Sequence, residues 1–120
     1  MKIVVTASGT EMTDQVDPRF GRAKYFLVVD TATGESEPHD NAQNLAAAQG
    51  AGIQAARNVA DLGVEAVVTG NVGPKAFSTL QASGMKIYIG AGGTVADAVE
   101  QFKAGKLECP NQANVQGHWT

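Results

Sequence analysis

The alternation of apolar and polar residues along the chain predicts a sheet of five strands. Short runs of β-branched and aromatic residues, bounded by turn residues, are typical of strands. The predicted strands are residues 2–7, 25–29, 35–40, 65–69 and 86–89. The second run is apolar on both faces, so we expect it near the centre of the sheet. The third is polar and contains Pro38, which cannot donate to a ladder on both sides, so it is expected at an edge, in a hairpin with the second.

Helical periodicity replaces this alternation between the later strands. An alanine-rich segment from about residue 46 to residue 62 predicts a first helix, which ends at a glycine. A second helix is expected from Gly73-Pro74 to Ser83-Gly84, because a proline at the first helical position loses no hydrogen bond. A third follows Thr94, which forms the pattern of a capping box with Asp97. The predicted order is therefore β-β-β-α-β-α-β-α, an α/β fold whose last two strands are parallel.

Composition narrows the possible classes of function. The chain has 120 residues, which suffices for one domain, and 43% of them are hydrophobic, which suffices for a core. Twelve acidic and nine basic residues give a net charge of −3, which argues against a general nucleic-acid-binding protein. The single cysteine, Cys109, excludes an internal disulfide and any zinc site or iron–sulfur cluster held by several cysteines of one chain. No apolar run resembles a signal peptide or a membrane span, so we expect a cytoplasmic protein.

Three loops leave the carboxyl ends of the first, fourth and fifth predicted strands, where open parallel α/β sheets bind ligands. The first is residues 8–22, and the other two, residues 70–73 and 90–93, are rich in glycine and lead into helices. Glycine lets a backbone approach a ligand closely, and the N–H groups at a helix start favour an anion. The alternative is that short strand-to-helix turns simply need glycine. Candidate binding residues in these two loops are Gly70, Asn71, Val72, Gly73, Gly90, Gly92, Gly93 and Thr94.

The first loop adds positive charge to this predicted crevice. Two of the three arginines of the chain lie in it, and arginine presents a fixed fork of donors suited to anions with several acceptor atoms. Its candidate binding residues are Arg19, Phe20, Gly21 and Arg22. The alternative is structural: Asp17 pairs with one of the arginines while Phe20 fills the core.

Other residues are weaker candidates for chemistry. Two carboxylates in one loop are more often solvated than bound to a metal, and a serine or threonine without a nearby base predicts no nucleophilic catalysis. A histidine on a polar edge strand is expected at the surface, and Cys109 is expected to be an ordinary free thiol. These weaker candidates are Asp14, Asp17, His39, His118, Cys109, Ser8 and Thr10.

Three motifs together resemble those of the nitrogenase iron–molybdenum cofactor biosynthesis domain family. They are Val16-Asp17-Pro18-Arg19-Phe20-Gly21-Arg22-Ala23, Val67-Val68-Thr69-Gly70-Asn71-Val72-Gly73-Pro74-Lys75-Ala76-Phe77 and Ile89-Gly90-Ala91-Gly92-Gly93-Thr94-Val95. The resemblance extends to about Leu107, so residues 1–107 are expected to form a metal-cluster-binding domain and residues 108–120 a C-terminal tail. Within the family, the chain looks most like the small stand-alone form of sulfate-reducing bacteria, which carries a molybdenum–copper sulfide cluster.

The resemblance implies a ribonuclease-H-like fold, with the edge hairpin on one side of the first strand and the fourth and fifth strands on the other. It also implies that the domain holds or delivers a preformed molybdenum–copper sulfide or related iron–molybdenum–sulfur cluster without catalysing a reaction. A cluster donor or recipient protein would then be a partner. Members of the nitrogenase branch commonly have histidine where this chain has Arg19. Arginine stays protonated and contacts anions by hydrogen bonds, which argues against direct metal ligation at this position.

Two other classes of function stay open. A ribonuclease-H-like phosphoryl-transfer enzyme needs several carboxylates around divalent metals, and the first strand supplies none. A phosphate- or nucleotide-binding regulatory module would use the glycine turns as a cradle. These turns lack both the lysine-serine/threonine signature of a P-loop and a complete dinucleotide-binding fingerprint.

Overall fold

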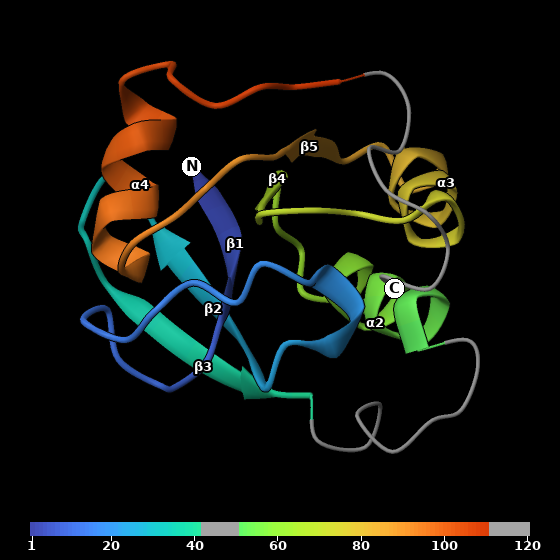
Figure 1. Ribbon diagram of the computed structural model, residues 1–120, viewed down its shortest axis with the longest axis horizontal. Coiled ribbons are helices and arrows are strands. Elements are labelled where there is room, and N and C mark those ends of the chain that lie inside the picture. The colour runs from blue at the N-terminus through green and yellow to red at the C-terminus, as the bar shows by residue number, and fades with distance from the viewer. Residues whose placement is uncertain (42–50, 111–120) are drawn as a thin grey trace.

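The computed structural model describes residues 1–41 and 51–110, which form an α/β fold (Figure 1). The strands are β1 (Lys2–Ala7), β2 (Tyr25–Asp30), β3 (Ser36–Asp40), β4 (Ala66–Val68) and β5 (Lys86–Tyr88). The helices are α2 (Ala51–Ala60), α3 (Pro74–Ala82) and α4 (Val95–Lys103), with a 3-10 turn, η1 (Phe20–Arg22). The predicted order of elements is confirmed. Residues 46–50 of the first predicted helix lie outside the described residues. No described helix is long and apolar enough to cross a membrane.

The sheet has the strand order β3-β2-β1-β4-β5. The pairs β1–β2 and β2–β3 are antiparallel, whereas β1–β4 and β4–β5 are parallel. This arrangement confirms the predicted mixed sheet with an antiparallel edge hairpin. The apolar strand β2 has neighbours on both sides, and the polar strand β3, which contains Pro38, lies at the edge.

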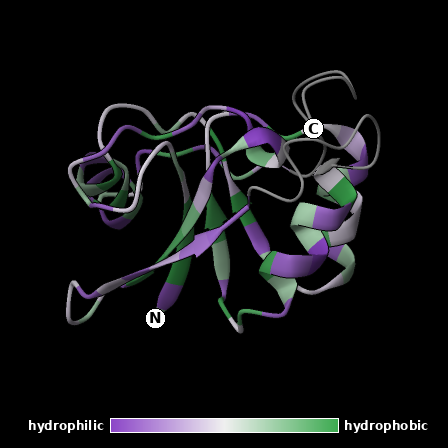
Figure 2. Ribbon diagram, turned by 90° about the horizontal axis from the view of Figure 1, so that it is seen from below, coloured by the Kyte–Doolittle hydropathy of each residue, from purple (hydrophilic) through white to green (hydrophobic). Residues whose placement is uncertain are grey.

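Alternation along β1 divides the core into two layers. Val4 faces the layer beneath α2 and α3, and Ile3 and Val5 face the layer beneath α4. The helices accordingly cover opposite faces of the sheet (Figures 1 and 2). All three side chains are fully buried, and each contributes about 1.5–3 kcal/mol relative to an exposed position. The carboxyl ends of β1, β4 and β5 are thereby held in fixed positions.

The fifth strand ends one residue earlier than predicted. The N–H of Ile89 donates to the carbonyl oxygen of Glu108 at 2.8 Å, so Ile89 pairs with the chain beyond α4. Leu107 packs against the core layer beneath α4. The beginning of the predicted tail is therefore attached to the sheet, beside the carboxyl end of β5.

Candidate functional site

The first loop runs across the carboxyl ends of the strands and ties the three predicted loops together. The N–H of Asn71 donates to the Pro18 carbonyl oxygen at 2.7 Å, and the N–H of Phe20 donates to that of Asn71 at 3.2 Å. Farther back in the loop, the N–H of Val16 donates to the Gly93 carbonyl oxygen at 2.9 Å. Segments that are far apart in the sequence thus form one continuous surface.

Gly70 is required by this crossing. A Cβ atom there would lie 2.7 Å from Cα of Pro18 and 2.9 Å from its carbonyl oxygen, closer than such contacts are found. The carbonyl oxygen of Gly70 also accepts from the N–H of Gly90 at 3.0 Å, which joins the two glycine loops. The close approach of Pro18 therefore explains the glycine at position 70 without a ligand.

Gly92 differs from Gly70, because nothing in the fold requires glycine there. A Cβ atom would meet no atom within 4 Å, and its φ is not positive. Its backbone is held by Gln101 of α4, whose Nε2 donates to the Gly92 carbonyl oxygen at 3.2 Å and whose Oε1 accepts from the Gly92 N–H at 3.3 Å. The β5–α4 loop is therefore fixed in place with its backbone exposed.

The start of α4 uses its own N–H groups within the protein. The predicted capping box is present, with reciprocal bonds between Thr94 and Asp97. The next two N–H groups, of Val95 and Ala96, donate at 2.9 Å to carbonyl oxygens of the first loop, those of Asp14 and Met12. These bonds leave little donor capacity at this helix end for an anion.

The start of α3 is different. Its N-cap is Gly73, which has no side chain to accept, and the next residue is Pro74, which has no N–H. The N–H groups of Lys75 and Ala76 donate to no acceptor among the residues that the structure describes. An uncapped helix start carries partial positive charge, which attracts an anion.

Positive side chains lie beside this uncapped start. The backbone bridge between Arg19 and Asn71 brings the first loop against the turn before α3. Arg19 keeps 51% of its side chain exposed, and Nε lies 3.7 Å from Oδ1 of the nearly buried Asp17. Lys75, in the first turn of α3, is also exposed. The structural alternative, in which Asp17 pairs with one of the arginines, is confirmed for Arg19. Half of that arginine nevertheless stays accessible to solvent.

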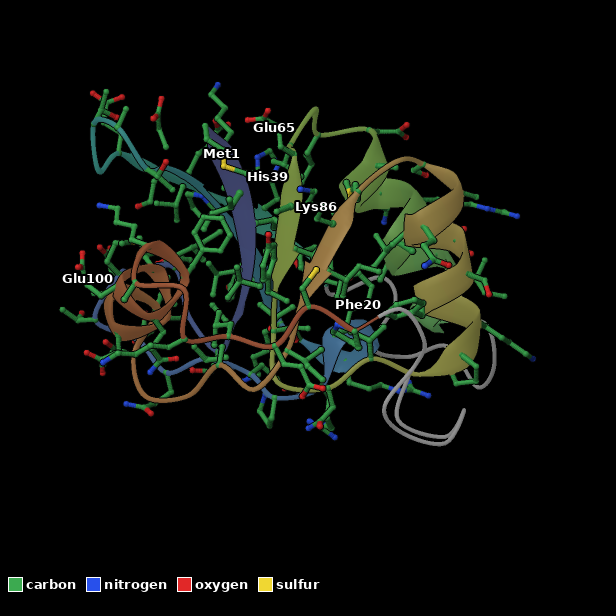
Figure 3. All side chains as sticks on the ribbon, turned by 90° about the horizontal axis from the view of Figure 1, so that it is seen from above. Met1, Phe20, His39, Glu65, Lys86 and Glu100 are labelled. Carbon is green, nitrogen blue, oxygen red and sulfur yellow. The ribbon has the colours of Figure 1, made fainter. Side chains whose placement is uncertain are left out.

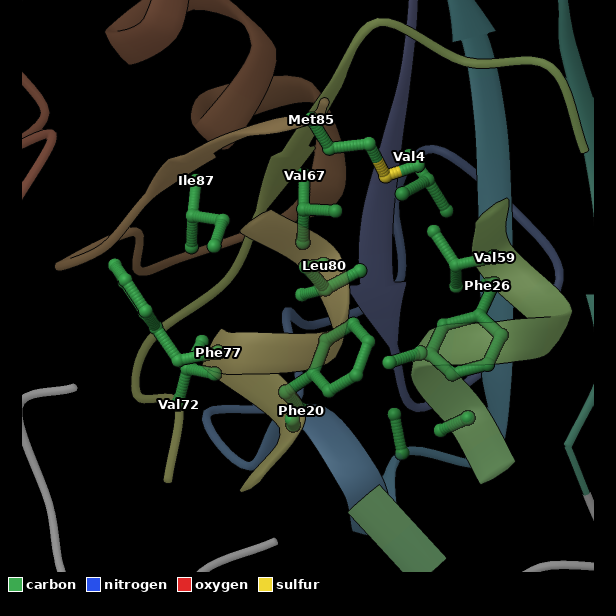
Figure 4. Packing of buried hydrophobic residues seen from close by; sticks show 14 of the residues in the cluster. Val4, Phe20, Phe26, Val59, Val67, Val72, Phe77, Leu80, Met85 and Ile87 are labelled. Carbon is green, nitrogen blue, oxygen red and sulfur yellow. The ribbon is translucent and has the colours of Figure 1, made fainter. Parts of the chain in front are cut away.

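Two predicted binding residues have buried side chains. Phe20 is fully buried and stacks on Phe26 with ring centroids 5.6 Å apart (Figure 4), and Val72 is fully buried in the same core layer. Phe20 therefore fills the core, as the structural alternative held, and anchors the loop that carries the arginines. Neither side chain is therefore accessible to a ligand.

Sequence reasoning missed Asn41, which holds the backbone just after the first loop by hydrogen bonds. Asn41 is fully buried, and its Nδ2 donates to the carbonyl oxygen of Ala23 at 2.8 Å. Its N–H donates to the Lys24 carbonyl oxygen at 2.9 Å. A polar residue after a polar edge strand gives no signal of burial, and only a long-range contact reveals this one.

No group of three or more histidine, cysteine or acidic side chains suited to a metal ion occurs among residues 1–41 and 51–110. His39 lies 3.7 Å from Glu37 on the edge strand, and Asp14 accepts from the N–H of Glu11 within the first loop. Ser8 donates to the Gln15 carbonyl oxygen. Cys109 is exposed, and His118 lies outside the described residues.

The opposite end of the strands has a different character. Met1 and Glu65 lie there, away from the buried Phe20 (Figure 3). A hollow of about 280 Å³ on the edge hairpin contains none of the predicted binding residues and is lined by Lys2, Val28, Asp30, Glu35, Ser36 and Glu37. Its carboxylates repel an anion, which favours the loop end of the sheet as the candidate site.

Comparison with known proteins agrees with the observed fold. The chain is 31% identical over 97 residues to an uncharacterized protein of Methanocaldococcus jannaschii, covering 79% of this chain and 82% of that one. The apo form of the orange protein from Desulfovibrio gigas superposes with a TM-score of 0.91 at 44% identity, covering 95% of this chain and 96% of that chain. A protein from Thermotoga, proposed to be a NifB protein, superposes with a TM-score of 0.82 at 35% identity, covering 97% and 98%.

A family match spans nearly all of the described structure. The family described as dinitrogenase iron-molybdenum cofactor matches residues 1–105, which include all five strands and the three loops of the candidate site. The chain therefore belongs to the dinitrogenase iron–molybdenum cofactor family.

Proposed function

We propose that this protein binds and carries a preformed, anionic metal–sulfur cluster without catalysing a reaction on it. The cargo would be a molybdenum–copper sulfide cluster or a related iron–molybdenum–sulfur cluster. One observation carries the proposal: the half-exposed Arg19 is bridged to the turn that opens the uncapped helix α3. Family membership supports the choice of cargo.

The donors at this site suit a cluster that arrives complete. Terminal sulfide and oxide groups accept hydrogen bonds from guanidinium and backbone N–H groups, so a charged cluster can be held without a bond from protein to metal. The described residues fit that mode of binding, because they combine exposed cations with open N–H groups and offer no cluster of metal ligands. A cluster donor and a recipient protein would complete the pathway.

A phosphate- or nucleotide-binding role is the second candidate, because an uncapped helix start also binds oxyanions. The nuclease alternative has less support. Strand β1 carries no carboxylate, and the described part of the chain has no carboxylate cluster for a divalent metal.

Metal and sulfide analysis of the protein isolated from its own host tests the proposal directly. We expect molybdenum with inorganic sulfide, accompanied by copper or iron, and absorption in the visible range. Titration of the metal-free protein with tetrathiomolybdate plus Cu(I), in parallel with phosphate and ATP, compares the candidate ligands. Saturable binding of ATP or phosphate, with no binding of the thiometallate, would replace this proposal with the second candidate.

A further inference from the structure

Two threonine hydroxyl groups lie buried beneath the arginine loop. Thr6, near the carboxyl end of β1, and Thr69, directly after β4, are both fully buried. Their neighbours Val5 and Val68 are apolar and equally buried. Burying a hydroxyl group is unfavourable unless it is hydrogen-bonded, so the bonds that these two hydroxyl groups make indicate their role.

The direction of these hydrogen bonds follows from the number of protons available. Oγ1 of Thr6 lies 2.7 Å from the Asp17 carbonyl oxygen and 2.8 Å from Oγ1 of Thr69. A carbonyl oxygen only accepts and each hydroxyl has one proton. Thr6 therefore donates to Asp17, and Thr69 donates to Thr6.

These bonds hold the backbone of Asp17 on both sides. Its carbonyl oxygen accepts from the Thr6 hydroxyl, and its N–H donates to the Thr6 carbonyl oxygen at 3.0 Å. Its side-chain Oδ1 accepts from the N–H of Arg19 at 2.9 Å and lies 3.7 Å from Nε of the same residue. A continuous series of contacts thus runs from the two central strands to the exposed guanidinium group.

We propose that Thr6 and Thr69 are positioning residues that act through Asp17 to fix the direction of the Arg19 side chain toward a bound thiometallate. This inference rests on the proposed function for its ligand, although the orientation of Arg19 is a property of the ligand-free protein. An arginine held in direction before binding loses less side-chain entropy when the anion arrives. The threonines touch no ligand themselves.

The first measurement uses the ligand-free protein. Thr6→Val removes the hydroxyl with little change in shape, and Thr6→Ser retains it. We expect the NMR signal of the Arg19 Nε–H group to shift in Thr6→Val and to return in Thr6→Ser, while that of Arg57 stays unchanged. Thr69→Val should move the signal less, because Thr6 still donates to Asp17. Val59→Ala, a core substitution in α2, controls for lost stability. An Arg19 signal that responds equally to Thr6→Val and Val59→Ala would overturn the proposal.

The second measurement is binding of tetrathiomolybdate plus Cu(I). We expect Thr6→Val to weaken binding by about two- to tenfold, the effect of freeing one long side chain. In an Arg19→Ala background the same substitution should have no further effect, because the residue through which it acts is absent. An equal loss in both backgrounds would overturn the role of Arg19. Absence of binding by the wild-type protein would count against the proposed function instead, and the Arg19 signal would still decide the positioning role.

Discussion

At the scale of single residues, the candidate site depends on Arg19. One neighbour of this side chain, Asp17, is negatively charged, and the other, the start of α3, carries partial positive charge. Asp17 orients Arg19 but lies at a distance too long for a strong hydrogen bond between their side chains. The start of α3 adds partial positive charge beside it. The guanidinium group pairs with Asp17 at this distance and stays half exposed, which leaves part of it accessible to an anion.

Arg19→Ala should weaken thiometallate binding more than it weakens folding. A charge-assisted hydrogen bond contributes about 1.5–3 kcal/mol to oxygen acceptors and less to sulfide, so we expect a loss of about tenfold to a hundredfold in affinity at most. The free energy of unfolding should change by no more than about 0.5 kcal/mol, because Arg19 is half exposed. Titrations at two salt concentrations and thermal melts measure both effects.

The exposed Arg57 of α2 is the matched control for charge. Arg57→Ala changes the net charge equally but lies outside the three loops of the candidate site, so binding should stay at the wild-type level. Arg22→Ala is expected to weaken binding as well. The Arg19 effect should diminish at high salt, because ions screen exposed charges beyond roughly 8–10 Å. Equal losses in the Arg19 and Arg57 variants would indicate a general charge effect rather than a site.

Substitution of Gly70 and of Gly92 should affect stability differently, because the fold requires glycine only at Gly70. Gly70→Ala should lower the free energy of unfolding by about 1–3 kcal/mol, because its methyl group would overlap Pro18. Gly92→Ala should leave it unchanged or raise it by up to about 1 kcal/mol, because the position is open and alanine restricts the unfolded chain. Urea denaturation of both variants tests this contrast. Similar destabilisation at both positions would show that the β5–α4 loop also needs glycine for its conformation.

At the scale of elements, the start of α3 lacks a side-chain cap and is part of the proposed anion site. Gly73→Asp would supply the missing acceptor and a negative charge. Because Gly73 is buried, the cost of burying a carboxylate opposes the capping gain of about 0.3–1 kcal/mol, so we expect no net gain in stability, together with weaker thiometallate binding. Gly73→Ser supplies the acceptor without the charge and should weaken binding less. Thermal melts and titrations of the two variants provide the comparison. Unchanged binding in Gly73→Asp would exclude the start of α3 from the site.

The elements themselves were largely predictable from local sequence. Alternation and turn residues located the strands, and Thr94 with Asp97 located the start of α4, because the forces that form them act between near neighbours. The contacts that shape the candidate site are long-range and leave no such pattern. The bond from Asn71 to Pro18, the burial of Asn41 and the pairing of Ile89 with Glu108 each join distant segments. From the sequence, the starts of α3 and α4 were both predicted to bind an anion. In the structure, the N–H groups at the start of α4 donate to carbonyl oxygens of the first loop instead.

At the scale of the whole molecule, the exposed guanidinium group of Arg19 and the uncapped start of α3 lie at the same end of the sheet, at the carboxyl ends of β1, β4 and β5. Addition of tetrathiomolybdate plus Cu(I) should therefore change the amide NMR signals of Arg19, Asn71 and Lys75 most strongly. The edge strand β3 should change little, because it lies at the far side of the sheet and carries carboxylates. The largest changes at His39 would contradict the assignment of the site to the carboxyl ends of β1, β4 and β5.

Cys109 is expected to be dispensable for holding the cluster, although the fold brings it near the loops. The bond between Ile89 and Glu108 places this exposed thiol one residue beyond the sheet. Binding through arginine and backbone N–H groups needs no thiolate, so Cys109→Ser should retain the visible spectrum and the affinity of the reconstituted protein. Loss of colour in a folded Cys109→Ser protein would instead establish thiolate ligation.

The crossing of the first loop makes the proposed carrier rigid before it binds a cluster. The bonds from Asn71 to Pro18 and from Val16 to Gly93 already join the three loops in the ligand-free chain. Their amides should therefore resist hydrogen exchange before any cluster arrives, and loading should add little protection. A recipient would then distinguish full from empty carriers by the exposed surface and negative charge of the cargo, since the polypeptide presents nearly the same outline in both states.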